Sequence, residues 1–364
     1  MKVLIVAQQL RRRVPGGIGT YVRGLTMGLR ALDGGRDVTL WASAVRGGAG
    51  RGGDDDPLAS LGRVRTSSLP APLLTRAWDV GFAGAPPGFD VLHATSLAVP
   101  PPRGTPATVL VHDVAFRHVP EAYPRRGRRW HEAALRRAIR RARLLAVPSP
   151  ETAEDLLAAG APTESVCVLT NPYGCDHLAP ADAAATSGLL ARLGVDGEYL
   201  LTVSTLEPRK NLQRLVGAYR AARPRLPEPW PLVVVGPSGW GHELAPEAGV
   251  VLAGPVPGAA LAGLYGRARL VAYVPLLEGF GLPAVEAMYA CAPVVASPMP
   301  STGGAAFEVD PRDVDAIADA LVAVAGQEGV RSQLVTAGVL RSSELTWEAA
   351  ARRHVELWSE VVGS

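Results

Sequence analysis

The chain has 364 residues, of which 48% are hydrophobic and 20% are charged, and its formal net charge is +3. This length indicates about two domains, and the apolar fraction excludes a disordered chain. The small net charge argues against a nucleic-acid-binding protein, and three cysteines are too few for a disulfide framework or a zinc site.

The first half alternates short apolar runs with helical patterns, which is typical of buried parallel strands in βαβ units. The start, MKVLIVAQQ, has the pattern of a strand and not of a signal peptide. A helix should begin at Pro150, where Ser149 can act as its cap. The remaining predictions are strands at 3–7, 38–42, 91–94, 108–111 and 144–147 and a helix at 21–32, after a glycine-rich turn.

The region 172–197, rich in Pro, Gly, Asp and Ala, predicts a linker that contains a short helix, and the alternation then restarts. Two successive patterns of this kind predict two Rossmann-like α/β domains whose parallel sheets face a central cleft. The predicted strands are 199–203, 232–235, 270–274 and 294–296, and the helices are 212–222, 257–267, 282–290, 313–325, 330–340 and 347–362.

The segment EGFGLPAVE, residues 278–286, follows a predicted strand and opens a helix. Its glycines allow a close approach of the backbone to a ligand, and the helix start presents N–H donors that suit a phosphate. Glu278 and Glu286 flank this turn and could accept hydrogen bonds from the hydroxyls of a sugar or ribose. A glycine turn with a capping glutamate is the alternative interpretation.

The segment STLEPRKN, residues 204–211, also lies between a strand and a helix. Arg209 stands beside Lys210, and the chain has only one other lysine, Lys2. This pair could neutralise a diphosphate and stabilise it as a leaving group. The alternative, an exposed basic turn, is disfavoured because cations at a helix N-terminus repel its dipole unless an anion is present.

Two weaker signals lie in the first half. The turn Gly16–Gly19 permits close phosphate approach but is not a full dinucleotide-binding fingerprint. His112 follows a predicted strand, at the end where open α/β sheets bind ligands. A structural histidine is an equally good interpretation of His112.

These segments together are similar to retaining glycosyltransferases of family 4, the group 1 type with the GT-B fold. The resemblance covers GGIGTYVRGL, VHDVAF, PYGCD, TLEPRKN, EGFGLPAVEAM and the closing LTWEAAARRHVELW. It implies an N-terminal acceptor domain over 1–175, a C-terminal nucleotide-sugar donor domain over 176–346, and a helix over 347–364 that crosses back to the first domain.

The resemblance also implies roles for individual residues. Arg209 and Lys210 would hold the donor diphosphate, Glu278 would contact the sugar and Glu286 would bind the ribose. The other implied donor contacts are His112 at the sugar, Gly17 at the phosphates, Phe280, Gly281 and Leu282 through their backbone, and the turn at Val256 at the base. Two departures stand out: the segment after Ser297 is shorter than usual, and Tyr173 replaces the usual asparagine.

The implied reaction is transfer of a sugar from a nucleoside-diphosphate sugar to an acceptor hydroxyl, with retention and with no cofactor or required metal. The acceptor would belong to a natural product or a cell-surface glycan. A sugar-nucleotide epimerase on the same fold is an alternative. The basic segment Arg125–Arg143 has apolar residues at helical spacing, which allows peripheral contact with the inner membrane surface and a lipid-linked acceptor. Packing of that apolar stripe on the sheet is the commoner outcome.

Overall fold

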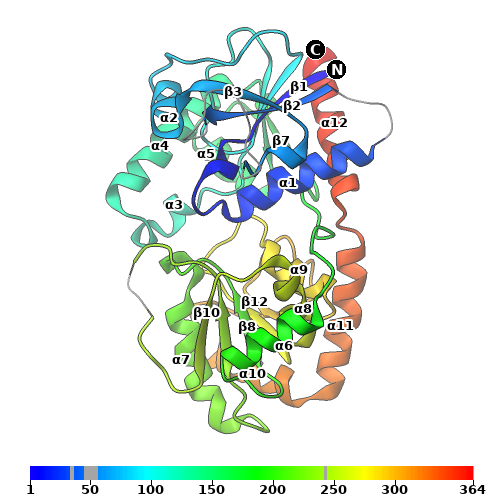
Figure 1. Ribbon diagram of the computed structural model, residues 1–364. Coiled ribbons are helices and arrows are strands. Elements are labelled where there is room, and N and C mark those ends of the chain that lie inside the picture. The colour runs from blue at the N-terminus through cyan, green and yellow to red at the C-terminus, as the bar shows by residue number, and fades with distance from the viewer. Residues whose placement is uncertain (33–36, 45–55, 242–243, 364) are drawn as a thin grey trace. The chain divides into compact units, whose positions relative to one another are not determined.

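The computed structural model describes residues 1–32, 37–44, 56–241 and 244–363 (Figure 1). Its contacts divide the chain into two compact units. Unit 1 comprises Met1–Val114, Arg125–Gly174 and Thr346–Ser364. Unit 2 comprises Ala115–Pro124 and Cys175–Leu345, so a short piece of the first half is grouped with the second.

Unit 1 is built on a parallel sheet with the strand order β3-β2-β1-β4-β5-β6-β7. The strands are β1 (Lys2–Val6), β2 (Asp37–Ala44), β3 (Arg63–Pro70), β4 (Val91–Ala94), β5 (Ala107–Leu110), β6 (Leu144–Val147) and β7 (Val166–Val168). The helices are α1 (Gly16–Ala31), α2 (Ala71–Asp79), α4 (Arg125–Arg141), α5 (Pro150–Ala158) and α12 (Trp347–Gly363). As predicted, Ser149 caps α5, since its side chain accepts a hydrogen bond from the backbone N–H of Thr152.

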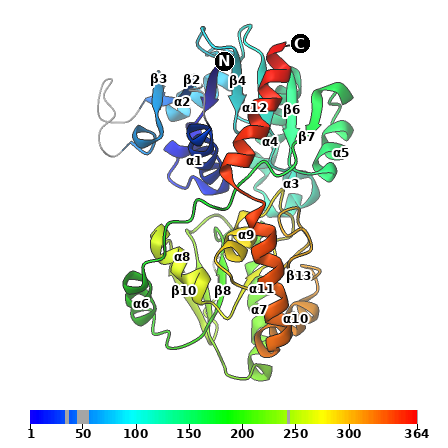
Figure 2. The ribbon, with the colours of Figure 1, turned by 90° about the vertical axis from the view of Figure 1, so that its right-hand side faces the viewer.

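The C-terminal helix α12 packs against α1 within unit 1 (Figure 2). Two glycines of α1 make this close approach possible. A Cβ on Gly24 would lie 1.9 Å from the ring of Trp347, and a Cβ on Gly28 would lie 2.0 Å from its carbonyl oxygen. These glycines weaken α1 as an isolated helix, but only they allow the two backbones to come this near.

Unit 2 has a second parallel sheet with the order β10-β9-β8-β11-β12-β13. The strands are β8 (Leu200–Val203), β9 (Leu232–Val235), β10 (Val250–Gly254), β11 (Leu270–Tyr273), β12 (Val294–Ala296) and β13 (Phe307–Glu308). The helices are α3 (Ala115–His118), α6 (Ala183–Arg192), α7 (Leu212–Ala222), α8 (Gly258–Arg267), α9 (Leu282–Tyr289), α10 (Val314–Gly326) and α11 (Glu328–Ser343). Buried side chains of the strands, of α7 and of α10 form a hydrophobic core on one face of this sheet.

The predicted strands are confirmed, and the four strands that the sequence did not predict are all edge strands. They are β3 and β7 in unit 1 and β10 and β13 in unit 2. Inner strands such as β9 and β12 are fully buried and therefore appear as continuous apolar runs. An edge strand such as β3 (RVRTSSLP) is half exposed and lacks that signal.

The chain therefore has two parallel, doubly wound α/β units, with the C-terminal helix returning to the first, as the sequence predicted. In each sheet the strand order reverses at one point, between β1 and β4 in unit 1 and between β8 and β11 in unit 2. Ligands of open α/β sheets bind outside the carboxyl ends of the strands at such a switch point.

Candidate functional site

The two strongest sequence motifs meet at the switch point of unit 2. Residues 204–211 follow β8, and residues 274–282 follow β11, the neighbouring strand. Asn211 joins the two segments, because its amide Nδ2 donates to the carbonyl oxygens of Val274 (3.0 Å) and Pro311 (2.6 Å). Asn211 has a left-handed backbone with φ of 61°, which ends the turn Pro208–Lys210 and starts α7. The basic pair is thus held on a fixed turn.

Arg209, Lys210 and Glu278 form one ionic cluster. Glu278 Oε1 accepts from Arg209 Nη1 at 2.6 Å and makes a short contact with Lys210 Nζ. Arg209 Nη2 also donates to Glu207 at 3.1 Å, and Lys210 Nζ donates to the hydroxyl of Tyr273 at 2.8 Å. The two cations therefore face two carboxylates, and the charges of the four side chains balance.

Burial by itself would raise the pKa of Glu278, but Arg209 and Lys210 outweigh it and lower that pKa to about 2. Burial and the neighbouring Arg209 lower the pKa of Lys210, against the opposing pull of Glu278. Glu278 is thus a carboxylate at any ordinary pH. It can accept hydrogen bonds from hydroxyl groups but has no proton to donate.

Helix α9 begins at Leu282, directly after this cluster, and Pro283 lies in its first turn as predicted. Gly281 precedes it with φ of +97°, and a Cβ there would lie 2.2 Å from Met299 Sδ and 2.9 Å from Ser301 Oγ. Only glycine fits this position. In the first turn of α9, Pro283 has no N–H and the N–H of Ala284 donates to Gly281 O at 3.2 Å, so it is the positive end of the helix dipole that can attract an anion here.

The segment after Ser297 packs against the start of α9. Ser301 donates through its hydroxyl to Gly281 O (3.0 Å) and through its backbone to Phe280 O (3.1 Å). Arg341 of α11 donates to the carbonyl oxygens of Ser301 and Pro300 and holds this turn in place. The segment after Ser297 therefore supports the glycine turn.

Glu286 lies within α9 and is almost fully buried. One carboxylate oxygen accepts from His177 Nε2 and the other from the hydroxyl of Tyr265, both at 3.0 Å. Each oxygen keeps a further lone pair, which two neighbouring hydroxyls could use. Val256, in the turn between β10 and α8, is half-buried in the same unit.

In unit 1, His112 follows β5 and both of its ring nitrogens have partners. Nε2 lies 2.8 Å from the carbonyl oxygen of Thr95, and Nδ1 lies 2.5 Å from the hydroxyl of Tyr173. Because a carbonyl only accepts, Nε2 carries the hydrogen and neutral Nδ1 accepts from Tyr173. Burial lowers the pKa of His112. Tyr173, which replaces the family's asparagine, thus orients this histidine, and Gly17 lies exposed in the first turn of α1.

A neutral hydrogen-bonded network lies beside His112 in unit 1. The hydroxyl of Tyr21 bridges His93 Nε2 and His354 Nε2, each at 2.7 Å. His93 Nδ1 lies 2.9 Å from the hydroxyl of Thr108. Burial lowers the pKa of His93 well below its usual value and lowers that of His354 to about 4. The network therefore links α12 to the sheet without any charge.

The sequence did not predict the side chains that support these residues. Tyr273, His177 and Tyr265 were not named, Asn211 was covered only as part of a motif, and Tyr173 was named as a departure with no role assigned. Tyr273 ends a strand beside the switch point, and that position could have identified it. His177 and Tyr265 contact Glu286 across long stretches of sequence, which no local pattern shows.

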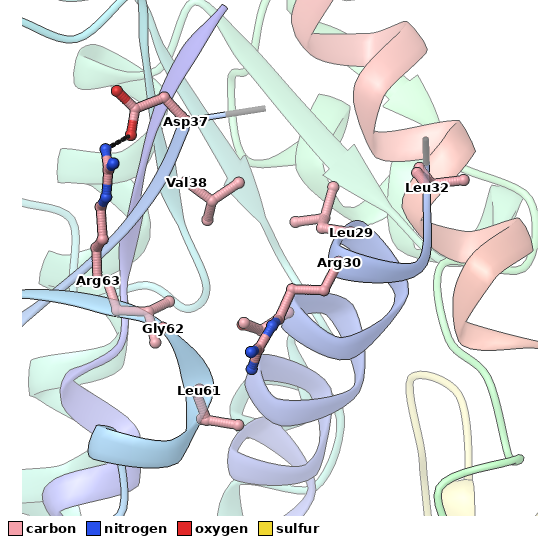
Figure 3. A pocket seen from close by; sticks show the side chains of 10 residues that line it. Leu29, Arg30, Leu32, Asp37, Val38, Leu61, Gly62 and Arg63 are labelled. Atoms are coloured by element: carbon pink, nitrogen blue, oxygen red, sulfur yellow. Dashed lines mark hydrogen bonds and ion pairs between the residues drawn. The ribbon is translucent and has the colours of Figure 1, made fainter. Parts of the chain in front are cut away.

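One pocket of about 550 Å³ lies elsewhere in unit 1 (Figure 3). Its lining comes from the end of α1, the start of β2 and the residues around Gly62, and Arg63 pairs with Asp37 at its rim. None of the candidate residues lines this pocket. It lies where β2 begins, at the amino ends of the strands and therefore away from the carboxyl ends, where ligands bind. It is therefore not part of the candidate site.

Within residues 1–32, 37–44, 56–241 and 244–363, no cluster of three or more His, Cys, Asp or Glu side chains could hold a metal ion. No helix in this part of the chain is both long enough and apolar enough to span a bilayer.

Comparison with known proteins agrees with this geometry. A model of Glycosyltransferase Family 4 matches residues 15–176, and a model of Glycosyl transferases group 1 matches residues 197–327. A D-inositol 3-phosphate glycosyltransferase of Frankia alni is 30% identical over 387 residues, which cover 93% of this chain and 92% of that protein. The O-antigen chain mannosyltransferase B of Escherichia coli is 28% identical over 256 residues, which cover 66% of this chain and 67% of the relative.

A solved structure of Anabaena Alr3699/HepE in complex with UDP-glucose has a TM-score of 0.71 at 19% identity, and the match covers 99% of this chain and 100% of that chain. The two parallel α/β units are those of a GT-B glycosyltransferase. The chain belongs to the group 1 glycosyltransferases of family 4.

Proposed function

We propose that this glycosyltransferase moves a hexosyl group from a nucleoside-diphosphate sugar to an acceptor hydroxyl, with retention of the anomeric configuration. The observation that carries the proposal is the ionic cluster of Arg209, Lys210 and Glu278 at the switch point, beside the start of α9. Two cations and a helix N-terminus at one edge of a sheet are suited to a diphosphate.

The cluster explains how the leaving group would be stabilised. Glu207 and Glu278 balance the charges of Arg209 and Lys210, and a diphosphate would share the same two cations. As the glycosidic bond breaks, negative charge grows on the diphosphate, and preorganised cations favour that state. We infer that these side chains supply the charge that a metal supplies in other transferases, so transfer should proceed in EDTA.

The remaining roles are proposals that rest on the family resemblance and fit the local geometry. Glu278, held as a carboxylate, would accept hydrogen bonds from the donor sugar. Glu286 has lone pairs for two ribose hydroxyls. Phe280, Gly281 and Leu282 would bind through the backbone and Val256 would line the base, while Gly17 and His112 would contribute from unit 1.

The relatives indicate which donors to test first. One is called a mannosyltransferase, another a D-inositol 3-phosphate glycosyltransferase, and the HepE structure contains UDP-glucose. UDP-glucose, UDP-N-acetylglucosamine and GDP-mannose, each in EDTA, would be paired with methyl hexosides and inositol 3-phosphate as acceptors. Proton NMR would follow the anomeric signals.

The proposal predicts acceptor-dependent release of the nucleoside diphosphate and a product with the anomeric configuration of the donor. Inversion would contradict retention, and a strict need for magnesium would contradict metal independence. Isomerisation of the donor without an acceptor would favour the epimerase. A control without enzyme measures spontaneous hydrolysis of the donor.

A second proposal is peripheral contact of the Arg125–Arg143 region with an anionic membrane, at which a lipid-linked acceptor could be used. Helix α4 carries eight arginines and one glutamate. Its apolar residues Ala134, Leu135 and Ala138 are buried, which supports packing on the unit and leaves only an electrostatic role for α4 itself. Sedimentation with anionic vesicles tests this contact.

A further inference from the structure

Helix α2 and the turn that follows it expose three large apolar side chains to solvent. Leu73, Arg76 and Val80 follow one another at the i, i+3 and i+7 positions of one helical face, and Phe82 stands in the turn that follows. Val80 is 71% exposed, Phe82 is 77% exposed and Leu73 is 55% exposed. Single exposed apolar side chains are common, but three large ones gathered on ten residues form a patch.

The exposed residues of the patch are held by buried packing and by backbone hydrogen bonds. Trp78, on the opposite face of α2, is buried and packs against Trp41 with ring centroids 5.2 Å apart. The backbone N–H of Phe82 donates to Ala77 O at 2.9 Å, and Arg103 donates to Phe82 O at the same distance. The exposure of Phe82 therefore belongs to an ordered turn that the protein holds outward.

Basic side chains lie beside the patch: Arg76 is exposed within it, Arg103 donates to Phe82 O, and Arg141 Nη2 lies 3.9 Å from where a Cβ on Gly81 would stand. Helix α4 lies beside α2 (Figure 1), joined to it by bonds from Trp130 and Arg137 to Asp79. Asp79, the acidic residue of α2, is thus already engaged by Trp130 and Arg137. Arg136 and Arg140 of α4 are exposed to solvent. Apolar side chains between cations match the interface of an anionic bilayer, where arginines meet phosphates and apolar groups enter the acyl boundary.

We propose that Leu73, Val80 and Phe82 form a membrane-insertion surface, and that the arginines of α4 bind the anionic headgroups around it. The inserting element is therefore α2 and its following turn, because the apolar residues of α4 are buried in the unit. This inference rests on the proposed contact of α4 with an anionic membrane and is independent of the sugar donor.

The test is co-sedimentation of the full chain with phosphatidylcholine vesicles that contain 0 or about 30% phosphatidylglycerol, at low and high salt. Wild type should bind only the anionic vesicles, and salt should weaken the binding. Phe82→Ser should reduce the partition coefficient about tenfold or more, because a buried aromatic ring is lost from the lipid. Arg136→Gln and Arg140→Gln should each reduce it about fivefold.

Leu340→Ser is the matched control, because Leu340 is 68% exposed on α11 of unit 2. It should leave vesicle binding unchanged. A second readout is Phe82→Trp, whose fluorescence should be quenched by lipids brominated on their acyl chains. The proposal is overturned if wild type does not bind anionic vesicles, or if Leu340→Ser weakens binding as much as Phe82→Ser. If wild type binds these vesicles and Phe82→Ser leaves the binding unchanged, the contact through α4 stands and the insertion surface proposed here is wrong. The proposal is also overturned if the protein binds vesicles and soluble polyglutamate alike and Phe82→Ser changes neither, since the surface then recognises acidic polymers.

Discussion

The two units hold their polar side chains in opposite ways. In unit 2, Arg209, Lys210 and Glu278 are joined by charge, and Glu278 stays ionised because its pKa falls to about 2. In unit 1, Tyr21, His93 and His354 are joined by neutral hydrogen bonds, and burial lowers the pKa of both histidines.

The difference indicates what each region can bind. A cluster of fixed charges is prepared for an anion, because its cations need no reorganisation when the anion arrives. In the neutral network Tyr21, His93 and His354 are fully buried, so it serves tight packing and offers an anion no cation. Four experiments test this contrast, from the largest expected effect to the smallest.

Loss of either cation of unit 2 should have the largest effect. Lys210→Ala and Arg209→Ala should each lower kcat/KM by about 10²–10³-fold, the usual cost of one preorganised donor at a developing charge. Arg220→Ala is the control, since Arg220 is a mostly exposed basic residue paired with Glu247 in the same unit. Steady-state kinetics check this, and a loss no greater than that of the control would remove the cluster from the mechanism.

Acid should destabilise unit 1 first. A histidine whose pKa is lowered by folding binds protons only in the unfolded chain, so stability falls as pH drops below about 6.5. For His354, with a pKa of about 4, the loss reaches about 3 kcal/mol by pH 4. Urea unfolding between pH 7 and 5, above the range of most carboxylates, measures this effect. His354→Gln should flatten the profile, and a profile that keeps its slope would refute the neutral network.

Neutralising the internal carboxylate of unit 2 should separate binding from transfer. Glu278→Gln removes the anion that occupies Arg209 and Lys210, so UDP or GDP should bind about tenfold more tightly, or about 1.4 kcal/mol. Transfer should nevertheless slow, because the sugar loses a charged hydrogen-bond acceptor. Calorimetric titration beside kinetic assays detects the split. Weaker diphosphate binding would show that Glu278 supports the cations more than it competes for them.

Removing one hydroxyl from unit 1 should have the smallest effect on transfer. Tyr173→Phe leaves Nδ1 of His112 buried without its donor, at a cost of about 1–3 kcal/mol in stability. Transfer should fall several-fold through the misplaced histidine, while binding of UDP or GDP to unit 2 should not change. Thermal unfolding measures the loss of stability, steady-state kinetics the loss of transfer, and calorimetry the affinity for UDP or GDP. An equal loss of diphosphate affinity would end the distinction between the two regions.

The sequence predicted the parts of the fold that burial makes visible. Inner strands such as β9 and β12 are apolar throughout, whereas β3 and β13 at the edges are half exposed and were not recognised. The same limit applies to the site. Arg209 and Glu278 were identified because each lies in a strand–turn–helix motif. The contacts of Tyr173 with His112 and of His177 with Glu286 depend on tertiary packing, which has no sequence period.

The most direct measurement is a crystal structure of the protein with UDP or GDP in EDTA, using the nucleotide that raises its melting temperature more. The account predicts diphosphate oxygens within hydrogen-bond distance of Arg209 and Lys210 and at the N-terminus of α9, with Glu278 turned toward the sugar side. A diphosphate bound away from these residues, or one that enters the crystal only when a divalent metal is supplied, would contradict it.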